Sequence, residues 1–331
     1  MKFEQTNHIS PDLIRLFENT VLGTNGAKYK HLDVAQSVAH TDHPLSFSLR
    51  RREQLIANIT FCKRSFGLYL RYFAFDKRFQ SKGKARMNPK SQIKQEIETV
   101  FQQITAQYPG ADNYCYAYID AKNIRSKWMS ETFGFQTKAY LATQSFSRIW
   151  PKANPTLKEE RMSSELFETI EKNYGHYTAY FTHFFEKGSV YSIFNQNGER
   201  LAFAQFHKVR WEIQRLPGKL GGLQVKLLPY IPFINKLIQP KAHTFLVPEV
   251  VCNPSGNIAD VQRLFEAVLA KEQLHSLLWW NDTRDELYQK AQEKFSWGLL
   301  HQMIGVALVD VVVRGDFQPK EPLFIAAFDM V

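Results

Sequence analysis

Residues 73–86, FAFDKRFQSKGKAR, change character halfway along the stretch. Phe73, Ala74 and Phe75 are apolar or aromatic, as at the end of a β-strand. From residue 80 to residue 85 the sequence instead contains one glycine and two lysines. A strand, a glycine-containing loop and a helix form a recurrent arrangement for binding phosphate, because the N–H groups of the loop and of the helix start point outward together. The stretch therefore predicts an anion-binding turn.

The composition indicates a folded protein of two domains. At 331 residues the chain is longer than one ordinary core requires, and 44% of its residues are hydrophobic, so we expect nearly all of it to be ordered. The formal charge of +10 favours anionic partners. Charge alone does not separate nucleic acid, a phosphorylated ligand and an anionic membrane surface from one another.

Cysteine usage and hydropathy indicate a cytoplasmic protein. Cys62, Cys115 and Cys252 are far apart, without the paired spacing of a zinc site or a disulfide framework. The N-terminus, MKFEQTNHIS, lacks the apolar core of a signal peptide, and the runs LLPYIPFINKLI and MIGVALVDVVV are too short to span a bilayer. We therefore expect neither a membrane span nor a bound metal.

The first half of the chain predicts an ordered series of strands and helices. Residues 46–61 form a hairpin and residues 65–75 a third strand, and the helical spacing of apolar residues over 88–104 predicts a helix with Asn88 as N-cap and Pro89 at its first position. A strand over 114–119, a helix over 120–133 ended by Gly134, and a long strand or strand pair over 135–150 follow. Residues 151–160, polar and with two prolines, predict a linker.

The second half predicts the same order again. Residues 189–206 form a hairpin around Asn197-Gly198, a dipeptide that suits a tight hairpin turn. A strand over 243–251 leads into the loop NPSGN (253–257) and a helix whose apolar face runs from Ile258 to Leu269. A strand over 276–281, a helix over 282–295 and closing strand material follow. Hairpin, strand, loop, helix, strand, helix, strand in both halves indicates a duplication.

At this point the chain resembles the GNAT acetyltransferase superfamily. The loop after the fourth strand of that fold has the pattern Gln/Arg-x-x-Gly-x-Gly/Ala, which Gln80, Gly83 and Ala85 match. Many members also have an asparagine near the later helix and a following Gly-Phe pair, as Asn123 and Gly134-Phe135 provide here. The resemblance covers roughly residues 45–150, and the second half fits the same fold with a degraded loop. The chain is therefore similar to double-GNAT proteins.

This resemblance implies a fold class and a domain division. The class is α/β (α+β), with two tandem GNAT-like domains, each a mixed and mostly antiparallel sheet flanked by helices. Residues 1–152 would form the domain that binds acetyl-CoA. Residues 153–331 would form a degenerate GNAT-like domain without a cofactor, since NPSGN has one glycine, no basic residue and a proline that removes an N–H.

The resemblance also implies the residues that bind acetyl-CoA. The backbone from Lys82 to Ala85 would bind the pyrophosphate, and the strand edge from Phe73 to Phe75 would pair with the pantetheine arm. The chemistry of the loop agrees, because Gly83 lets the backbone approach phosphate and nearby basic residues offset its charge. The full set implied for the cosubstrate is Phe73, Phe75, Gln80, Ser81, Lys82, Gly83, Lys84, Ala85 and Asn123.

The implied reaction is N-acyl transfer by direct attack of an amine on the thioester carbonyl. A strand N–H near Phe75 would meet the developing oxyanion. Ser130 stands where many members have the tyrosine that protonates the leaving thiolate. Either Tyr116 or Tyr118 on the neighbouring strand substitutes for it, or the thiolate leaves unassisted. Asp120 is either a base acting through water or a helix cap. The acceptor is a small-molecule or peptide amine that the sequence does not identify.

Two alternative functions follow from the same residues. A Fem-type transferase, which is also similar to double GNATs, would use aminoacyl-tRNA and suit the basic charge. A GNAT fold without catalysis would serve as a binding or scaffold module, and Ser130 favours that interpretation. The basic residues concentrate at one loop, so we expect nucleic acid not to be the main partner.

Three further groups have ordinary structural interpretations. The segment with His40, Asp42 and His43 is predicted to be a polar loop, in preference to a metal pair or a catalytic base. Residues 228–238 are predicted to form a buried or interdomain insertion, in preference to a membrane contact or the lining of an acyl channel. Trp279 and Trp280 are predicted to be core and interface residues, in preference to a platform on which bases stack.

Overall fold

The computed structural model of the chain describes residues 2–23, 26–39, 41, 44–64, 66–79, 92–108, 114–182, 188–218 and 220–330. They divide into two compact units. Unit 1 consists of Met1–Ala139 and Asp310–Gln318, and unit 2 of Tyr140–Val309 and Pro319–Val331. The sequence places the division after residue 152, whereas the units meet in the chain between Ala139 and Tyr140, inside a strand.

Unit 1 is a sheet with helices on both faces. Its elements are β1 (Phe3–Thr6), α1 (Pro11–Glu18), β2 (Lys28–His31), α2 (Val34–Ala39), β3 (Pro44–Arg51), β4 (Gln54–Arg64), β5 (Gly67–Phe75), the 3-10 helix η1 (Lys77–Phe79), α3 (Gln92–Gln107), β6 (Cys115–Asp120) and α4 (Ile124–Thr132). The strand order is β1-β3-β4-β5-β6, followed by β13 (Ala307–Arg314). The predicted β3–β4 hairpin is confirmed, and Arg52 and Glu53 both take positive φ in its two-residue turn.

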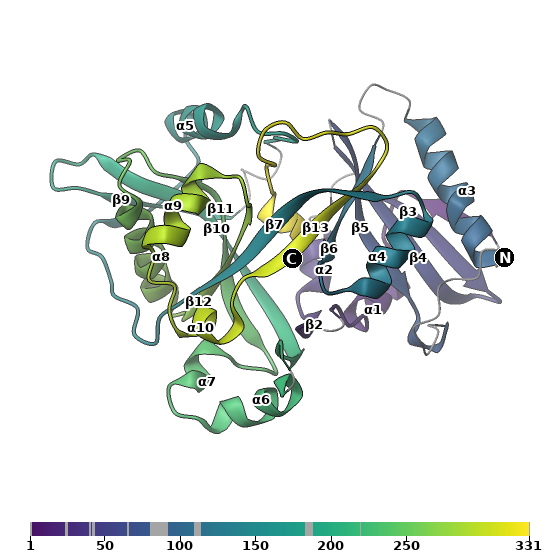
Figure 1. Ribbon diagram of the computed structural model, residues 1–331, viewed down its shortest axis with the longest axis horizontal. Helices are drawn as coiled ribbons and strands as arrows, with labels where there is room; N and C mark the ends of the chain where they lie inside the picture. The colour runs from purple at the N-terminus through teal and green to yellow at the C-terminus, as the bar shows by residue number, and fades with distance from the viewer. Residues whose placement is uncertain are drawn as a thin grey trace. The chain divides into compact units, whose positions relative to one another are not determined.

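The core of unit 1 lies between the sheet and α3 (Figure 1). The predicted apolar face of this helix is buried at Ile97, Val100, Phe101 and Ile104. Phe101 meets Phe61 of β4 edge to face, with ring centroids 5.8 Å apart. The other face of the sheet carries α1, whose buried side chains contact β5 residues in a second cluster; this cluster includes Leu13, Phe17, Val34, Tyr72 and Ala74.

Unit 2 repeats this plan. Its elements are β8 (Leu157–Glu160), α5 (Ser164–Tyr174), β9 (Ser189–Phe194), β10 (Arg200–Arg215), α6 (Gly221–Leu227), the 3-10 helix η2 (Leu228–Tyr230), α7 (Ile234–Leu237), β11 (His243–Cys252), α8 (Ile258–Glu272), β12 (Ser276–Asp282), α9 (Glu286–Lys294), α10 (Leu299–Ile304) and α11 (Ala327–Met330). The strand order is β7-β12-β11-β10-β9-β8, where β7 is Gln136–Ser147. The predicted hairpin at Asn197-Gly198 is confirmed, and α8 packs its apolar face on the sheet as predicted.

Two strands each serve both units. β7 begins in unit 1, but its residues from Leu141 to Ser147 pair with β12 in unit 2. β13 begins in unit 2, but from Asp310 onward it belongs to unit 1, where Val312 enters the core cluster under α3. Unit 1 therefore includes the segment Asp310–Gln318, which contains the end of β13 and whose neighbours in the chain on both sides belong to unit 2.

The structure corrects the sequence-based assignment at several places. The predicted linker, residues 151–160, contains strand β8, which pairs with β9. Helix α4 begins at Ile124 and not at residue 120. The elements β1, α1, β2 and α2 were not predicted. The predicted helix start at Asn88 and Pro89 lies outside the described residues. No helix in the described ranges is long and apolar enough to cross a membrane.

Candidate functional site

Strands β5 and β6 run side by side only at their beginning. All residues of both strands are described, and parallel register pairs join only Leu68 to Cys115 and Tyr69 to Tyr116. A β-bulge follows at once, because the register against β4 shifts between Leu70 and Tyr72 and leaves Arg71 as the extra residue. Bulges bend a strand and increase its twist. The remainder of β5 therefore diverges from β6.

The diverging part of β5 directs backbone groups toward the side of β6. Ala57 and Phe75 are register partners, and the N–H of Asp76 donates to the carbonyl oxygen of Ile56 at 2.8 Å. In an antiparallel ladder this pattern marks Ala57 and Phe75 as a pair that exchanges no hydrogen bonds, so the N–H and C=O of Phe75 point away from β4. Phe73, two residues earlier, has the same direction. The backbone groups of these two residues thus face the side of β6, and their pairing with a pantetheine arm stays a prediction.

Tyr116 and Tyr118 belong to an aromatic cluster on the face of the sheet opposite α3. Their ring centroids lie 5.8 Å apart, and each lies near the ring of Tyr69, at 5.2 and 5.3 Å. Tyr116 is buried, whereas Tyr118 is half-buried. Cys115 and Ala117 alternate with them and point into the core under α3. Both predicted acid candidates therefore lie on one face, beside the point where β5 leaves β6.

Asp120 and Asn123 lie where β6 leads into α4. Asn123 is the N-cap of α4, and its side chain accepts a hydrogen bond from the N–H of Ser126 at 3.1 Å. Asp120 does not cap the helix; its Oδ1 accepts a hydrogen bond from the N–H of Lys122 at 2.8 Å. Burial and, next, the charge of Asp120 raise the pKa of Tyr29 on β2. Asp120 therefore faces the segment around β2 and is not committed to the helix.

A polar group on β2, α2 and β5 lies on the same face and was missed by sequence reasoning. Arg71, the bulge residue, donates from Nη2 to the Oγ of Ser37 at 2.7 Å. Burial and, next, the positive charge of Arg71 lower the pKa of His31 to about 4, so this imidazole is neutral at neutral pH. No motif marks these residues, since β2 and α2 are short and the bulge breaks the period of β5.

Other predicted residues fall outside the described part of the chain. These are Gln80, Ser81, Lys82, Gly83, Lys84 and Ala85 of the phosphate-binding loop, and His40, Asp42 and His43. Just before the loop, Arg78 forms an ion pair with Asp76 at 2.7 Å, and its hydrogen bond lowers the pKa of Asp76 to about 2. Arg78 is therefore already engaged by a carboxylate. Among the described residues, no group of three or more His, Cys, Asp or Glu side chains is placed to hold a metal.

Cys115 on β6 and Cys252 at the end of β11 remain thiols. Burial raises the pKa of Cys115 to about 12, and burial also raises the pKa of Cys252. A thiol is a poor nucleophile compared with a thiolate. The ionisation of these side chains thus does not favour a covalent cysteine intermediate, and Cys62, Cys115 and Cys252 are all buried and unbridged.

Unit 2 has the same strand divergence. β11 and β12 share one parallel register pair, Leu246 with Leu277, along strands that are described throughout. A bulge again follows, since the register against β10 shifts between Glu249 and Cys252, and Val250 within it has a φ of 46°. For a β-branched residue this conformation is rare. The bulge and the divergence are therefore part of the duplicated plan.

The loop of unit 2 differs from an anion-binding turn. The Oγ of Ser255 donates to Asn253 Oδ1 at 3.0 Å and lies 2.6 Å from Asp260 Oδ2. Asp260 is a buried residue in the first turn of α8 and forms an ion pair with Arg263. Asn257 caps the helix through the N–H of Ala259. A carboxylate of the chain itself therefore already lies at the helix start, where a diphosphate would be repelled.

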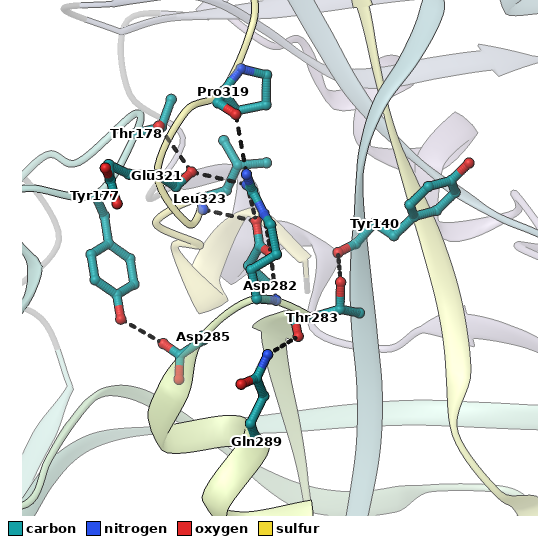
Figure 2. A network of polar contacts seen from close by, with 11 residues as sticks. Tyr140, Tyr177, Thr178, Asp282, Thr283, Asp285, Gln289, Pro319, Glu321 and Leu323 are labelled. Atoms are coloured by element: carbon teal, nitrogen blue, oxygen red, sulfur yellow. Dashed lines mark hydrogen bonds and ion pairs between the residues drawn. The ribbon is translucent and has the colours of Figure 1, made fainter.

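The C-terminal segment, residues 319–330, packs on unit 2. The N–H of Leu323 donates to Asp282 Oδ2 at 2.9 Å, at the end of β12, and the N–H of Ala327 donates to Glu249 Oε1 on β11 at 3.2 Å. Figure 2 shows the first of these contacts together with Thr178, whose Oγ1 donates to the carbonyl of Glu321 at 3.1 Å. The segment is thus bonded to both diverging strands of unit 2. Trp279 and Trp280 of β12 are buried, as predicted.

The solved structures that are similar to this chain include two that match 96% of it. N-myristoyltransferase from Saccharomyces cerevisiae with bound myristoyl-CoA has a TM-score of 0.56 at 10% identity, over 96% of this chain and 84% of that chain. A tandem GNAT protein from the clavulanic acid biosynthesis pathway, without AcCoA, has a TM-score of 0.55 at 7% identity, over 96% of this chain and all 100% of that chain. The chain has the tandem GNAT fold. No protein-family model and no curated protein matches the sequence.

The tandem GNAT fold confirms the resemblance inferred from the loop, the asparagine and the Gly-Phe pair. Because the identities are 10% and 7%, what these proteins share with the chain is its architecture. The α/β (α+β) class with a mostly antiparallel sheet in each half is confirmed as well. Within this tandem GNAT fold, unit 1 and unit 2 have the same strand divergence.

Proposed function

We propose that the chain is an acyl-CoA-dependent N-acyltransferase whose unit 1 binds the cosubstrate. The observation that carries the proposal is the divergence of β5 from β6 after Tyr69, with the backbone of Phe73 and Phe75 directed toward the side of β6. Backbone groups with this direction suit an extended ligand that carries amides of its own, as in the recognition of peptides by β-augmentation. The pantetheine arm of coenzyme A is such a ligand.

The phosphate end of the cosubstrate is assigned to the loop beyond η1. Gln80 to Ala85 supply N–H groups, one glycine and two lysines, the features that bind a diphosphate. Because Arg78 is paired with Asp76, we assign the neutralisation of the diphosphate charge to Lys82 and Lys84 within the loop. Asn123 remains in the proposed set, with its Oδ1 engaged by Ser126.

The proposed chemistry is direct attack of an amine on the thioester carbonyl. The C–N bond forms while the N–H of Phe75 donates to the carbonyl oxygen, and the C–S bond then breaks. Asp120, through water, accepts the proton that the amine loses. Tyr118 donates a proton to the leaving thiolate; it is favoured over Tyr116 because it is the less buried of the two. Acetyl-CoA is our proposed cosubstrate, and the yeast neighbour with myristoyl-CoA is the reason to test longer chains as well.

Unit 2 is proposed to bind no acyl-CoA. Asp260 supports this, because its carboxylate lies in the first turn of α8 behind the NPSGN loop. The buried, unbridged cysteines support our further proposal of a reducing, cytoplasmic location.

The binding arm of the test compares two loops of the same chain. Gly83→Glu places a negative side chain in the proposed phosphate site and is expected to abolish binding of coenzyme A in calorimetry. The matched variant Gly256→Glu changes the loop of unit 2. It is expected to lower stability by about 1 kcal/mol, because Gly256 has a φ of 71°, and to leave affinity unchanged. If the Gly83→Glu variant and the unaltered protein bind coenzyme A with equal affinity, the assignment of the phosphate site to this loop is contradicted.

The turnover arm measures free thiol from acetyl-CoA and longer acyl-CoAs with a panel of amines, polyamines and peptides. Tyr118→Phe is expected to reduce kcat by about a hundredfold or more, the usual contribution of a positioned acid, with KM for acyl-CoA unchanged. Binding of coenzyme A without thiol release on any acceptor favours the scaffold alternative. Saturable tRNA binding at physiological salt, with turnover of aminoacyl-tRNA only, favours the Fem-type alternative.

A further inference from the structure

The segment between β10 and β11, residues 216–242, is an insertion with a strongly apolar outer surface. It holds α6, η2 and α7, and Figure 1 shows α6 and α7 at the ends of β10 and β11. On its outer side Leu220, Leu223 and Leu227 are at least half exposed, and Tyr230 is 84% exposed. The burial expected for residues 228–238 is therefore not found at Tyr230, and the interdomain alternative stays a prediction.

The inner side of the insertion fixes it to unit 2. Leu228, Leu237 and Ile238 are buried and form a cluster with Leu216 and with Leu300 of α10. The expectation of burial is correct for these residues. Because the inner side is packed, the exposed side chains are held on a supported surface and do not belong to an unstructured loop.

Aromatic rings extend the exposed surface. Trp150, just beyond β7, is 64% exposed, and its ring centroid lies 5.2 Å from that of Phe233, which is 53% exposed. Phe233 has a φ of 69°, a region that bulky residues rarely adopt. The Nζ of Lys236 lies 5.7 Å from the ring of Trp150. The exposed surface thus combines leucines, three aromatic residues and an adjacent cation.

The charge of this region has one sign. Residues 213–248 contain no aspartate or glutamate. Their charged side chains are all basic and are Arg215, Lys219, Lys226, Lys236 and Lys241. Lys226, Lys236 and Lys241 are exposed. An anionic surface would therefore meet no repulsive charge from this region.

We propose that the 216–242 insertion, together with Trp150, docks the protein on an anionic phospholipid bilayer. Exposed leucines insert among acyl chains, tryptophan and tyrosine suit the headgroup level, and flanking lysines meet anionic headgroups. A bilayer is favoured over a protein partner because the apolar side chains form an outward surface on an insertion with uniform positive charge, the combination that interfacial anchors have. The chain then lies on the membrane and does not span it.

The test is co-sedimentation of the full chain with vesicles of phosphatidylcholine, alone or with about 30% phosphatidylglycerol, a range in which anionic lipid attracts polybasic segments. We expect binding to the anionic vesicles that weakens with salt. Lys226→Glu/Lys236→Glu should weaken it roughly 25-fold or more, at about fivefold for each charge. Leu223→Gln/Tyr230→Ser should weaken it about tenfold or more through lost apolar burial.

Matched variants separate this surface from general charge and stickiness. Lys172→Glu/Lys271→Glu changes the net charge equally at exposed positions of α5 and α8, and Ile124→Gln/Tyr140→Ser removes two exposed apolar side chains elsewhere. Both should bind vesicles like the unaltered chain, and all variants should keep its thermal unfolding. No acyl-CoA is present, so the result is independent of the proposed transferase activity.

Three results would overturn the proposal. The first is that the unaltered chain does not bind anionic vesicles, or that the Leu223→Gln/Tyr230→Ser variant binds them as well as the unaltered chain does. The second is a dimer in solution that this variant converts to a monomer, which would make the surface a self-association site. The third is tRNA binding that only the lysine variant loses, with no vesicle binding, which would make it a nucleic-acid surface.

Discussion

Burial of His243 on β11 favours the neutral form of its imidazole in the folded protein. Desolvation lowers the pKa of this imidazole to about 4, and its Nε2 lies 3.3 Å from the Oγ of Ser276. In the unfolded chain the pKa is about 6.5. Between these values the unfolded state binds more protons, so stability rises with pH through this window and is lost on acidification.

We expect His243 to contribute about 2 kcal/mol to the loss of stability between pH 7 and pH 5, at about 1.4 kcal/mol per pH unit below the unfolded pKa. His243→Gln should flatten this part of the pH dependence in urea unfolding. His176→Gln, at an exposed position, is the control and should keep the slope. An unchanged slope in His243→Gln would show that this residue is not the source.

Residue by residue, the candidate site was predictable where a pattern repeats and not where a bulge interrupts it. Tyr114, Tyr116 and Tyr118 alternate with a period of two, which places them on one face of a strand. Arg71 is an extra residue in β5, and an inserted residue breaks the alternation from which a face is predicted. His31 lies on a strand of four residues, too short for a period to be detected.

At the scale of the element, the C-terminal segment stabilises unit 2. Phe324 is 5% exposed and lies in a cluster with Val250 and Cys252 of β11. Arg284 bonds the same segment through the carbonyl oxygens of Pro319 at 3.1 Å and Glu321 at 2.9 Å. Its single short helix, α11, has four residues, so tertiary packing and not local propensity holds it in place.

Phe324→Ala is therefore expected to lower the free energy of unfolding by about 3–5 kcal/mol, the usual cost of removing a buried phenylalanine ring. Denaturant unfolding followed by fluorescence measures this. Phe167→Ala on α5, where the ring is 38% exposed, should cost about 1 kcal/mol or less. Equal and small losses for both variants would mean that the segment is not bonded to unit 2 in solution.

Elements with a long period were predictable, and elements defined by tertiary contacts were not. α3 and α8 have apolar residues at helical spacing over three turns or more, and both were predicted. α1 has eight residues and β1 four, and the C-terminal segment has hardly any regular structure. Such segments are ordered by the surfaces they cover, which a sequence does not display.

At the scale of the whole molecule, the two units cannot be cut from the chain at one point. The segment Asp310–Gln318 belongs to unit 1, although the residues on both sides of it belong to unit 2. In unit 1, Val312 is buried in the cluster with Phe101, and Asp310 Oδ2 lies 2.5 Å from Lys127 Nζ. Local patterns assume that neighbours in the sequence fold together, so this exchange was not predictable from them.

The fragment 1–139 is therefore expected to aggregate or to unfold without cooperativity. It lacks the strand next to β6 and leaves an unpaired sheet edge, a template for aggregation. It also loses Val312 from the core and the partner of Glu98, which accepts a hydrogen bond from Arg314 at 2.7 Å. The same fragment joined to residues 310–318 by a flexible linker of about 15 residues, long enough to span roughly 20 Å, should be soluble and unfold cooperatively.

A single substitution separates restored strand pairing from a general effect of the added tail. Val312→Asp in the joined fragment places an unpaired charge in the core under α3, which costs several kcal/mol, so it should return the fragment to the behaviour of 1–139. Solubility by ultracentrifugation and the urea transition are the two readouts. Cooperative unfolding of fragment 1–139 alone would contradict the contribution of residues 310–318 to unit 1, because unit 1 would then be complete without β13. Binding of coenzyme A by the joined fragment would place the cosubstrate site entirely within unit 1.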